Sequence, residues 1–205
     1  MRAEHHTIDA FLEALAAKSP TPGGGAVAPL IGAHAAALAS MVVAYSLGRK
    51  SLAPHQPALE AADSQLRDIR RRFLDLAEAD AAAYARLNEA MRLPADAPGR
   101  TQTLGPAALA ALQPPEQVVA LGVELLQRCA HLAPITNRYL HSDLAMAAVF
   151  AEAAARASRW NILVNLPTLR ECSIDAGDPL ARADGLLDQG RLLLAQIESA
   201  CLPPS

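Results

Sequence analysis

The sequence predicts an all-α protein, a bundle of six or seven helices. Hydrophobic residues make up 52% of the chain and aromatic residues only 3%, and much of the apolar content is alanine, the strongest helix former. No segment alternates β-branched or aromatic residues with polar ones, as half-buried strands do. The 205 residues can form a sizeable core and show no internal repeat, so we expect one domain over residues 1–205.

Apolar spacing, capping residues and helix breakers place the helices along the chain. The first begins after Thr7, a suitable N-cap, and ends before the proline- and glycine-rich break at residues 19–24. The predicted helices cover residues 8–18, 25–48, 58–91, 106–112, 116–131, 142–169 and 178–201.

The second predicted helix has no Asp, Glu, Lys or Arg between Ala26 and Gly48. That length could span a membrane, but Pro29, His34 and the many alanines favour a helix buried in a bundle or a dimer interface. We therefore expect no membrane partner. Small residues recur along one side of this helix and would let another helix approach closely: Ala28, Gly32, Ala35 and Ala39.

The third predicted helix has apolar residues at alternating steps of three and four from Leu59 to Leu76, the spacing of a helix-pairing seam. The next step of four falls on Asp80, and the apolar pattern then resumes at Ala83 and Leu87. The periodicity therefore places a carboxylate where a core residue belongs.

The second half of the chain is harder to divide. Residues 94–115 are rich in proline, so we expect a loose connection there with only a short helix, and a long helix beginning after Pro115. Ser142 is a suitable N-cap for the helix that follows. A break near residues 158–161 of that helix is an alternative to a continuous helix.

The charge, cysteine and histidine content limit the classes of partner and cofactor that we expect. The net charge is −3 and no basic face dominates, so we expect no nucleic-acid partner. Cys129, Cys172 and Cys201 are odd in number and far apart, which is typical of packed, reduced thiols in a cytoplasmic protein. The six histidines form no metal-binding motif, and we expect no metal.

Asp80 is the sharpest candidate for catalysis. Burial raises the pKa of a carboxyl group unless it is paired, and a raised pKa suits a group that must both accept and donate protons near neutral pH. An Asp paired with a basic residue, or capping a neighbouring helix, would have the same spacing.

Three other polar residues are binding candidates. Asn161 and Asn165 are four residues apart and share a helix face, so their amides could bind a heterocycle or could cap a helix break. Asp143 follows Ser142 at a helix start, where an acid commonly interacts with the helix dipole. Basic residues after the second helix, Arg49 and Lys50, could attract a polyanionic ligand tail or lie on a solvated face.

Three segments together resemble the cyclodeaminase/cyclohydrolase family. They are "SPTPGGGAVAPLIGAHAAALASMVVAYSLGRK", "LAEADAAAYARLNEAMRLP" and "SDLAMAAVFAEAAARASRWNILVNL", in this order over nearly the whole chain. This family includes the C-terminal domain of formiminotransferase-cyclodeaminase and a stand-alone methenyltetrahydrofolate cyclohydrolase. The resemblance implies an all-helical domain that forms homodimers through its helices and binds reduced folate, with no metal or redox cofactor.

The resemblance implies one of two reactions. In the first, 5-formiminotetrahydrofolate cyclises to 5,10-methenyltetrahydrofolate and releases ammonia; in the second, 5,10-methenyltetrahydrofolate is hydrolysed to 10-formyltetrahydrofolate. A non-catalytic folate-binding or assembly relative is a third alternative.

Residues of this chain match positions of the family motifs. Asp80 matches the family's catalytic aspartate, and Asp143, Asn161 and Asn165 match positions expected to bind or orient the pteridine. Gly23, Gly24 and Gly25 would let the backbone approach the ligand and expose N–H groups at the start of the second helix. The expected contacts to a glutamate tail are Lys18, Arg49 and Lys50.

The chain departs from the family pattern at Pro29, which replaces a small residue in the first turn of the second helix, and in two further places. Ala26 stands where serine commonly follows the three glycines, so a hydroxyl that could contact the ligand is missing. The segment after Pro94 is poor in charge, which puts the exact substrate in doubt.

Overall fold

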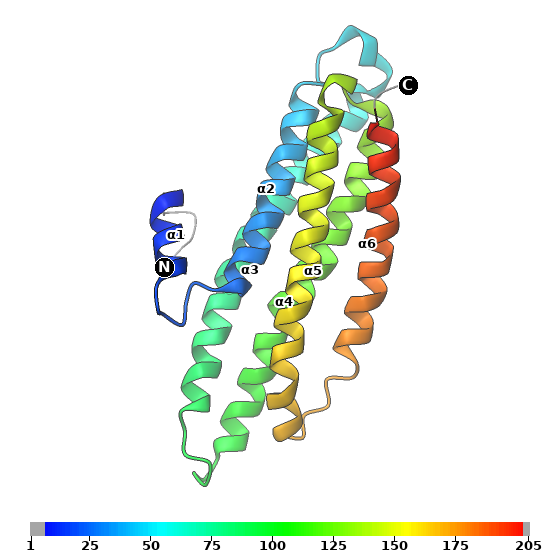
Figure 1. Cartoon of the computed structure of the whole chain (residues 1–205). Helices are drawn as coiled ribbons and strands as arrows, with labels where there is room; N and C mark the ends of the chain where they lie inside the picture. The colour runs from blue at the N-terminus through cyan, green and yellow to red at the C-terminus, as the bar shows by residue number, and fades with distance from the viewer. Residues whose placement is uncertain (1–6, 203–205) are drawn as a thin grey trace.

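The computed structural model describes residues 7–202 as an elongated bundle of helices (Figure 1). Six α-helices and no strands occur in this part of the chain, which confirms the all-α prediction. The α-helices are α1 (Ile8–Ala16), α2 (Gly24–Ala44), α3 (Gln56–Met91), α4 (Arg100–Leu132), α5 (His141–Glu171) and α6 (Pro179–Cys201). Short 3₁₀ segments join them: η2 (Lys50–His55), η3 (Ala133–Ile135) and η4 (Arg138–Leu140).

Helix α2 packs between α3 and α5 through its small side chains. Ala28, Ala35 and Ala39 are at most 1% exposed. A Cβ added at Gly32 would lie 2.5 Å from the ring of the fully buried Phe73, so the ring occupies the space of the missing side chain. The small side therefore permits the close helix approach that the sequence predicts.

Within residues 7–202, two helices are long and apolar enough to cross a membrane: Gly24–Ala44 and the segment Arg100–Ile135. More than half of each apolar window is buried inside the bundle, as in the core helices of soluble proteins. Burial against neighbouring helices accounts for their apolar composition.

Helix α4 corrects one prediction. It begins at Arg100 and continues through Pro106, Pro114 and Pro115, where we expected a loose connection and only a short helix at 106–112. Proline removes one backbone N–H and crowds the preceding turn, at a cost of about 3 kcal/mol, and burial of the apolar face of α4 offsets this cost. That face is buried over the whole length of α4, from Leu104 to Leu132.

Helix α5 decides one open alternative and corrects one prediction. It is continuous through residues 158–161, where a break was the alternative, and the buried Ser158 hydroxyl donates to the Ala154 carbonyl at 3.0 Å. Its N-cap is Leu140, so Ser142 lies inside the first turn. Asp143 is in the first turn, as predicted.

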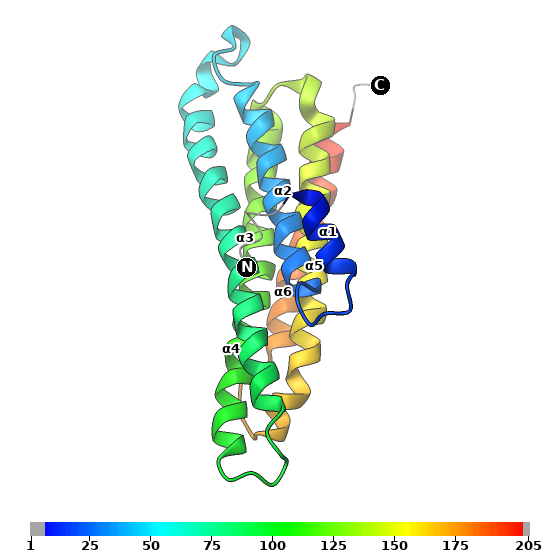
Figure 2. The same ribbon diagram turned by 90° about the vertical axis from the view of Figure 1, so that its left-hand side faces the viewer.

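Helix α1 stands apart from the bundle. Thr7 caps it as predicted, because its hydroxyl accepts a hydrogen bond from the Ala10 amide at 3.1 Å. None of its residues is buried, and Ile8 and Leu12 are 74% and 54% exposed. Figure 1 shows α1 to one side of the bundle, and Figure 2 shows it in front of α2 and α5. Its apolar side is therefore only partly covered by the described chain.

The cysteines are free thiols, as predicted, with Cys129 and Cys172 buried and Cys201 partly buried.

Candidate functional site

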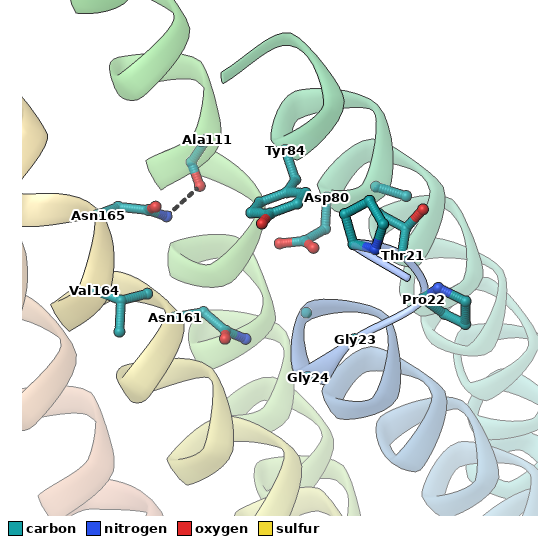
Figure 3. Close-up of a pocket in the computed structure, with 13 residues that line it drawn as sticks. Thr21, Pro22, Gly23, Gly24, Asp80, Tyr84, Ala111, Asn161, Val164 and Asn165 are labelled. Atoms are coloured by element: carbon teal, nitrogen blue, oxygen red, sulfur yellow. Dashed lines mark hydrogen bonds between the residues drawn. The ribbon is translucent and has the colours of Figure 1, made fainter. Parts of the chain in front are cut away.

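A cavity of about 270 Å³ lies where α2 begins, between α3 and α5 (Figure 3). The connection from α1 forms its rim with Pro20, Thr21 and Pro22. The start of α2 and one turn each of α3, α4 and α5 form the rest of the wall: Gly23, Gly24, Gly25, Asp80, Ala81, Tyr84, Ala111, Asn161, Val164 and Asn165. Six of the ten residues singled out from the sequence therefore meet in one cavity.

The three glycines bring backbone to the cavity. Gly23 is the N-cap of α2 and has no side chain to satisfy the free N–H groups of the first turn. A Cβ added at Gly25 would lie 1.9 Å from Oδ2 of Asp80, whereas one at Gly24 would lie 3.7 Å from Oδ1 of Asn161. Gly25 is thus required for space, because the Asp80 carboxyl group occupies the position of its side chain.

Asp80 is held in the cavity wall by the seam of α3. The side chains of Phe73, Leu76, Ala83 and Leu87 on that seam are all buried, as the spacing predicts. Burial raises the pKa of the Asp80 carboxyl from the ordinary 3.8 to about 6. No basic side chain among the described residues pairs with it, so the sequence alternative of a salt-bridged Asp is excluded for residues 7–202.

Tyr84 is a site residue that the sequence analysis did not single out. It lies one helical turn after Asp80 on the same face of α3, is 41% exposed, and lines the cavity. Figure 3 shows its phenol beside the Asp80 carboxyl group. The i,i+4 spacing from Asp80 would have identified it, whereas the rim residues Pro20 and Thr21 carry no such signal.

Asn161 and Asn165 both face the cavity from α5, as their spacing predicts. The Asn165 Nδ2 donates a hydrogen bond to the Ala111 carbonyl at 3.1 Å. Asn161 has no side-chain partner among the described residues. Neither amide caps a helix break, since α5 is continuous.

The remaining four predicted residues lie outside this cavity. Arg49 and Lys50 follow α2 at its far end, about 30 Å from Gly24 at 1.5 Å per residue. Asp143 is at the start of α5, about 27 Å from Asn161 on the same basis. Lys18 is exposed and lies two residues before the rim at Pro20.

Comparison with known proteins gives a consistent result. A family model described as formiminotransferase-cyclodeaminase matches residues 7–176. A Methylorubrum extorquens protein named methenyltetrahydrofolate cyclohydrolase is 28% identical over 199 residues, which cover 95% of each chain. The Mus musculus formimidoyltransferase-cyclodeaminase is 30% identical over 179 residues, or 80% of this chain, but the match spans only 31% of the mouse protein.

A crystal structure has the same fold. The formiminotetrahydrofolate cyclodeaminase of Thermotoga maritima superposes with a TM-score of 0.77 at 27% identity, covering 97% of this chain and 93% of that one. The family match extends over most of the chain and includes every residue that lines the cavity. The chain belongs to the formiminotransferase-cyclodeaminase family.

Proposed function

We propose that this chain is a one-carbon folate enzyme that cyclises 5-formiminotetrahydrofolate to 5,10-methenyltetrahydrofolate with release of ammonia. The observation that carries the proposal is the half-buried Asp80 carboxyl group, whose pKa is raised to about 6, in a cavity at the start of α2. Its relatives are named for folate cyclodeaminase and cyclohydrolase activities.

The geometry suits a single proton shuttle. N10 of the substrate attacks the carbon of the protonated formimino group, N5–CH=NH2+, and the Asp80 carboxylate accepts the N10 proton as the N10–C bond forms. The resulting tetrahedral carbon bears N5, N10 and an amino group. The Asp80 carboxyl then donates its proton to that amino group, which leaves as ammonia as the C–N bond breaks. A pKa near the working pH makes both transfers feasible for one group.

The rest of the cavity would bind and orient the ligand. Asn161 and Asn165 offer amide groups to the donors and acceptors of the pteridine ring. The free N–H groups of the first turn of α2 offer donors to a ring carbonyl or a carboxylate. These residues need no metal or redox cofactor for the proton transfers described.

Hydrolysis of 5,10-methenyltetrahydrofolate is the second candidate. The relative that matches over 95% of both chains is named for that reaction. There Asp80 would accept a proton from the attacking water and return it to N5 as the ring opens, and the remaining hydroxyl proton would pass to solvent as the formyl carbonyl forms. A non-catalytic folate-binding relative is the third.

A spectrophotometric assay of methenyltetrahydrofolate separates the three. We expect the absorbance of the methenyl compound to appear when the formimino substrate is added, at a rate proportional to enzyme. Accelerated loss of added methenyltetrahydrofolate would identify the hydrolase instead. Neither change, with an intact helical circular dichroism spectrum, would leave the non-catalytic alternative.

We further propose that the chain forms a homodimer through α5 and α2. A stripe on α5 runs at alternating steps of four and three through residues 146, 150, 153, 157, 160 and 164. Its large apolar side chains are all more than 40% exposed: Met146, Phe150, Trp160 and Val164. The neighbouring α2 has no charged residue on its outer side, and the apolar side of α1 is partly open too. An exposed apolar surface of this extent is typical of a protein interface.

Asp143 extends the same stripe of α5 at its N-terminal end. Asp143 lies one step of three before Met146, and Val164 at the other end lines the cavity. In an antiparallel pairing of two stripes, Asp143 of the partner subunit would lie near the cavity wall. A parallel pairing would place the two Asp143 carboxylates together, which is unfavourable.

Phe150→Glu tests the dimer. We expect sedimentation equilibrium to give twice the chain mass of 21.5 kDa for the wild type and a single chain mass for Phe150→Glu, because a charge in the apolar interface is not solvated. The matched control is Leu192→Glu on α6, which replaces a residue that is 75% exposed and outside the stripe. A dimeric Phe150→Glu protein, or a monomeric wild type, would contradict the proposed interface.

A glutamate tail on the folate, contacted by Lys18, Arg49 or Lys50, stays a prediction. Arg49 and Lys50 could reach only an extended polyglutamate, because they lie a helix length from the cavity. If they do contact the tail, the affinity should fall as salt concentration rises.

A further inference from the structure

The prolines of α4 leave an acceptor next to the cavity. In an α-helix the N–H of each residue donates to the carbonyl four residues earlier, and proline has no N–H. Pro114 and Pro115 therefore leave the carbonyls of Ala110 and Ala111 without a helical donor. Ala111 is only 5% exposed and lines the cavity, so its carbonyl needs a partner from another helix.

Asn165 of α5 supplies that partner. Its Nδ2 donates to the Ala111 carbonyl at 3.1 Å, as the dashed line in Figure 3 marks. A carbonyl oxygen only accepts hydrogen bonds, so the amide nitrogen of Asn165 must face α4. The amide oxygen Oδ1 is then the other end of the group, and no donor among the described residues pairs with it.

The two amides of the cavity consequently differ. Asn161 has no described partner and can turn either its oxygen or its nitrogen toward a ligand. Asn165 can turn only by giving up the hydrogen bond to Ala111. One position in the wall is therefore fixed as an acceptor, while the other can adapt.

We propose that Pro115 is a positioning residue that, through the Ala111 carbonyl, fixes Asn165 as a hydrogen-bond acceptor for a ring N–H or amino group of the substrate. This inference rests on the proposed folate function for the identity of the ligand. The fixed orientation of Asn165 would determine ligand specificity, because the cavity would select a heterocycle that presents an N–H donor at Asn165.

Pro115→Ala tests whether Pro115 positions Asn165, and Pro114→Ala is the matched control. Alanine at 115 restores the N–H donor to Ala111 and frees the Asn165 amide to turn, whereas alanine at 114 restores only the donor to Ala110. We expect Pro115→Ala to raise KM about three- to tenfold with kcat changed less than twofold, since uniform binding is lost. Pro114→Ala should leave both values unchanged, and neither variant should lower the melting temperature.

Two further variants separate positioning from a structural effect. Asn165→Ala should raise KM more than Pro115→Ala does, and adding Pro115→Ala to it should have no additional effect, because the two act through one hydrogen bond. Asn165→Asp places a carboxylate against the Ala111 carbonyl and should raise KM. Pro115→Ala should partly rescue that variant, because the restored N–H then occupies the carbonyl.

The orientation itself can be measured without substrate. In the ligand-free protein, NMR should show one side-chain amide proton of Asn165 shifted by its hydrogen bond, with the signals assigned by their loss in Asn165→Ala. Pro115→Ala should remove the shift and Pro114→Ala should keep it. Equal behaviour of the two proline variants, in the NMR shift or in KM, would overturn the proposal. An inactive wild type with the expected NMR result would refute the proposed folate reaction but keep the fixed orientation of Asn165.

Discussion

Replacing Asp80 with asparagine is expected to lower kcat by about 10²- to 10⁴-fold, because the amide cannot accept the proton of N10 or return one to the leaving amino group. The helical circular dichroism spectrum should be unchanged, since asparagine has nearly the same shape. Single-turnover measurements with the formimino substrate would check the chemical step directly. An Asp80→Asn protein that turns over at the wild-type rate would remove Asp80 from the mechanism.

The same substitution should stabilise the protein above pH 6. The folded-state pKa of Asp80, about 6, is above the ordinary 3.8, so the folded state binds more protons than the unfolded state between these values. The contribution of Asp80 to stability is present below about pH 4 and is lost as pH rises through 6. After a discount for partial solvent screening, Asp80→Asn should gain on the order of 2 kcal/mol over wild type at pH 7.

Urea denaturation at pH 4 and pH 7 measures this difference. The gain of Asp80→Asn over wild type should be small at pH 4 and full at pH 7. In the same pH range, kcat/KM of the wild type should rise through an inflection near the Asp80 pKa of about 6, because the ionised carboxylate is the base. A gain that is equal at both pH values would show that the carboxylate is not desolvated in the folded state.

Replacing Gly25 with alanine is expected to lower kcat/KM at least 100-fold and to destabilise the fold by about 1–3 kcal/mol. The added Cβ would lie 1.9 Å from Oδ2 of Asp80, so either the carboxyl group must leave its position or α2 must shift. Either movement separates the proton shuttle from the start of α2. Thermal unfolding and steady-state kinetics on the same preparation would measure both effects.

Two other glycine-to-alanine variants provide the controls. At Gly24 the added Cβ meets Asn161 Oδ1 at an ordinary 3.7 Å, so Gly24→Ala should not destabilise the fold. At Gly185, an exposed position on α6, nothing lies within 4 Å, and alanine should add about 0.5–1 kcal/mol of stability with unchanged kinetics. A Gly25→Ala protein that behaves like Gly185→Ala would contradict the close contact with Asp80.

Local signals in the sequence were sufficient for most helices and for the centre of the site. The cap at Thr7 and the seam of α3 depend on neighbours within one or two turns, so the sequence shows them directly. Asp80 was identifiable because it interrupts that seam. Tyr84 could have been identified by the same local rule, one turn further along.

The course of α4 and α5 could not be predicted in the same way. When only neighbouring residues are considered, the prolines at 114 and 115 indicate a helix break. They have no backbone N–H, so the carbonyls four residues earlier receive no hydrogen bond from within the helix. The Ala111 carbonyl instead receives its hydrogen bond from Asn165, which is 54 residues away in sequence. A partner at that distance becomes visible only when α4 and α5 are packed together.

The sequence by itself determined the helical class, the position of the Asp80 carboxylate in the seam of α3, the glycine-rich start of α2 and, through family motifs, the folate relationship. Only the tertiary structure decided which candidates meet. Asn161 and Asn165 reach the cavity because α5 runs past the start of α2, while Arg49, Lys50 and Asp143 lie at the far ends of the same helices. The physical reason is that helix periodicity fixes which face a residue occupies, but the direction and packing of each helix fix its distance from the site.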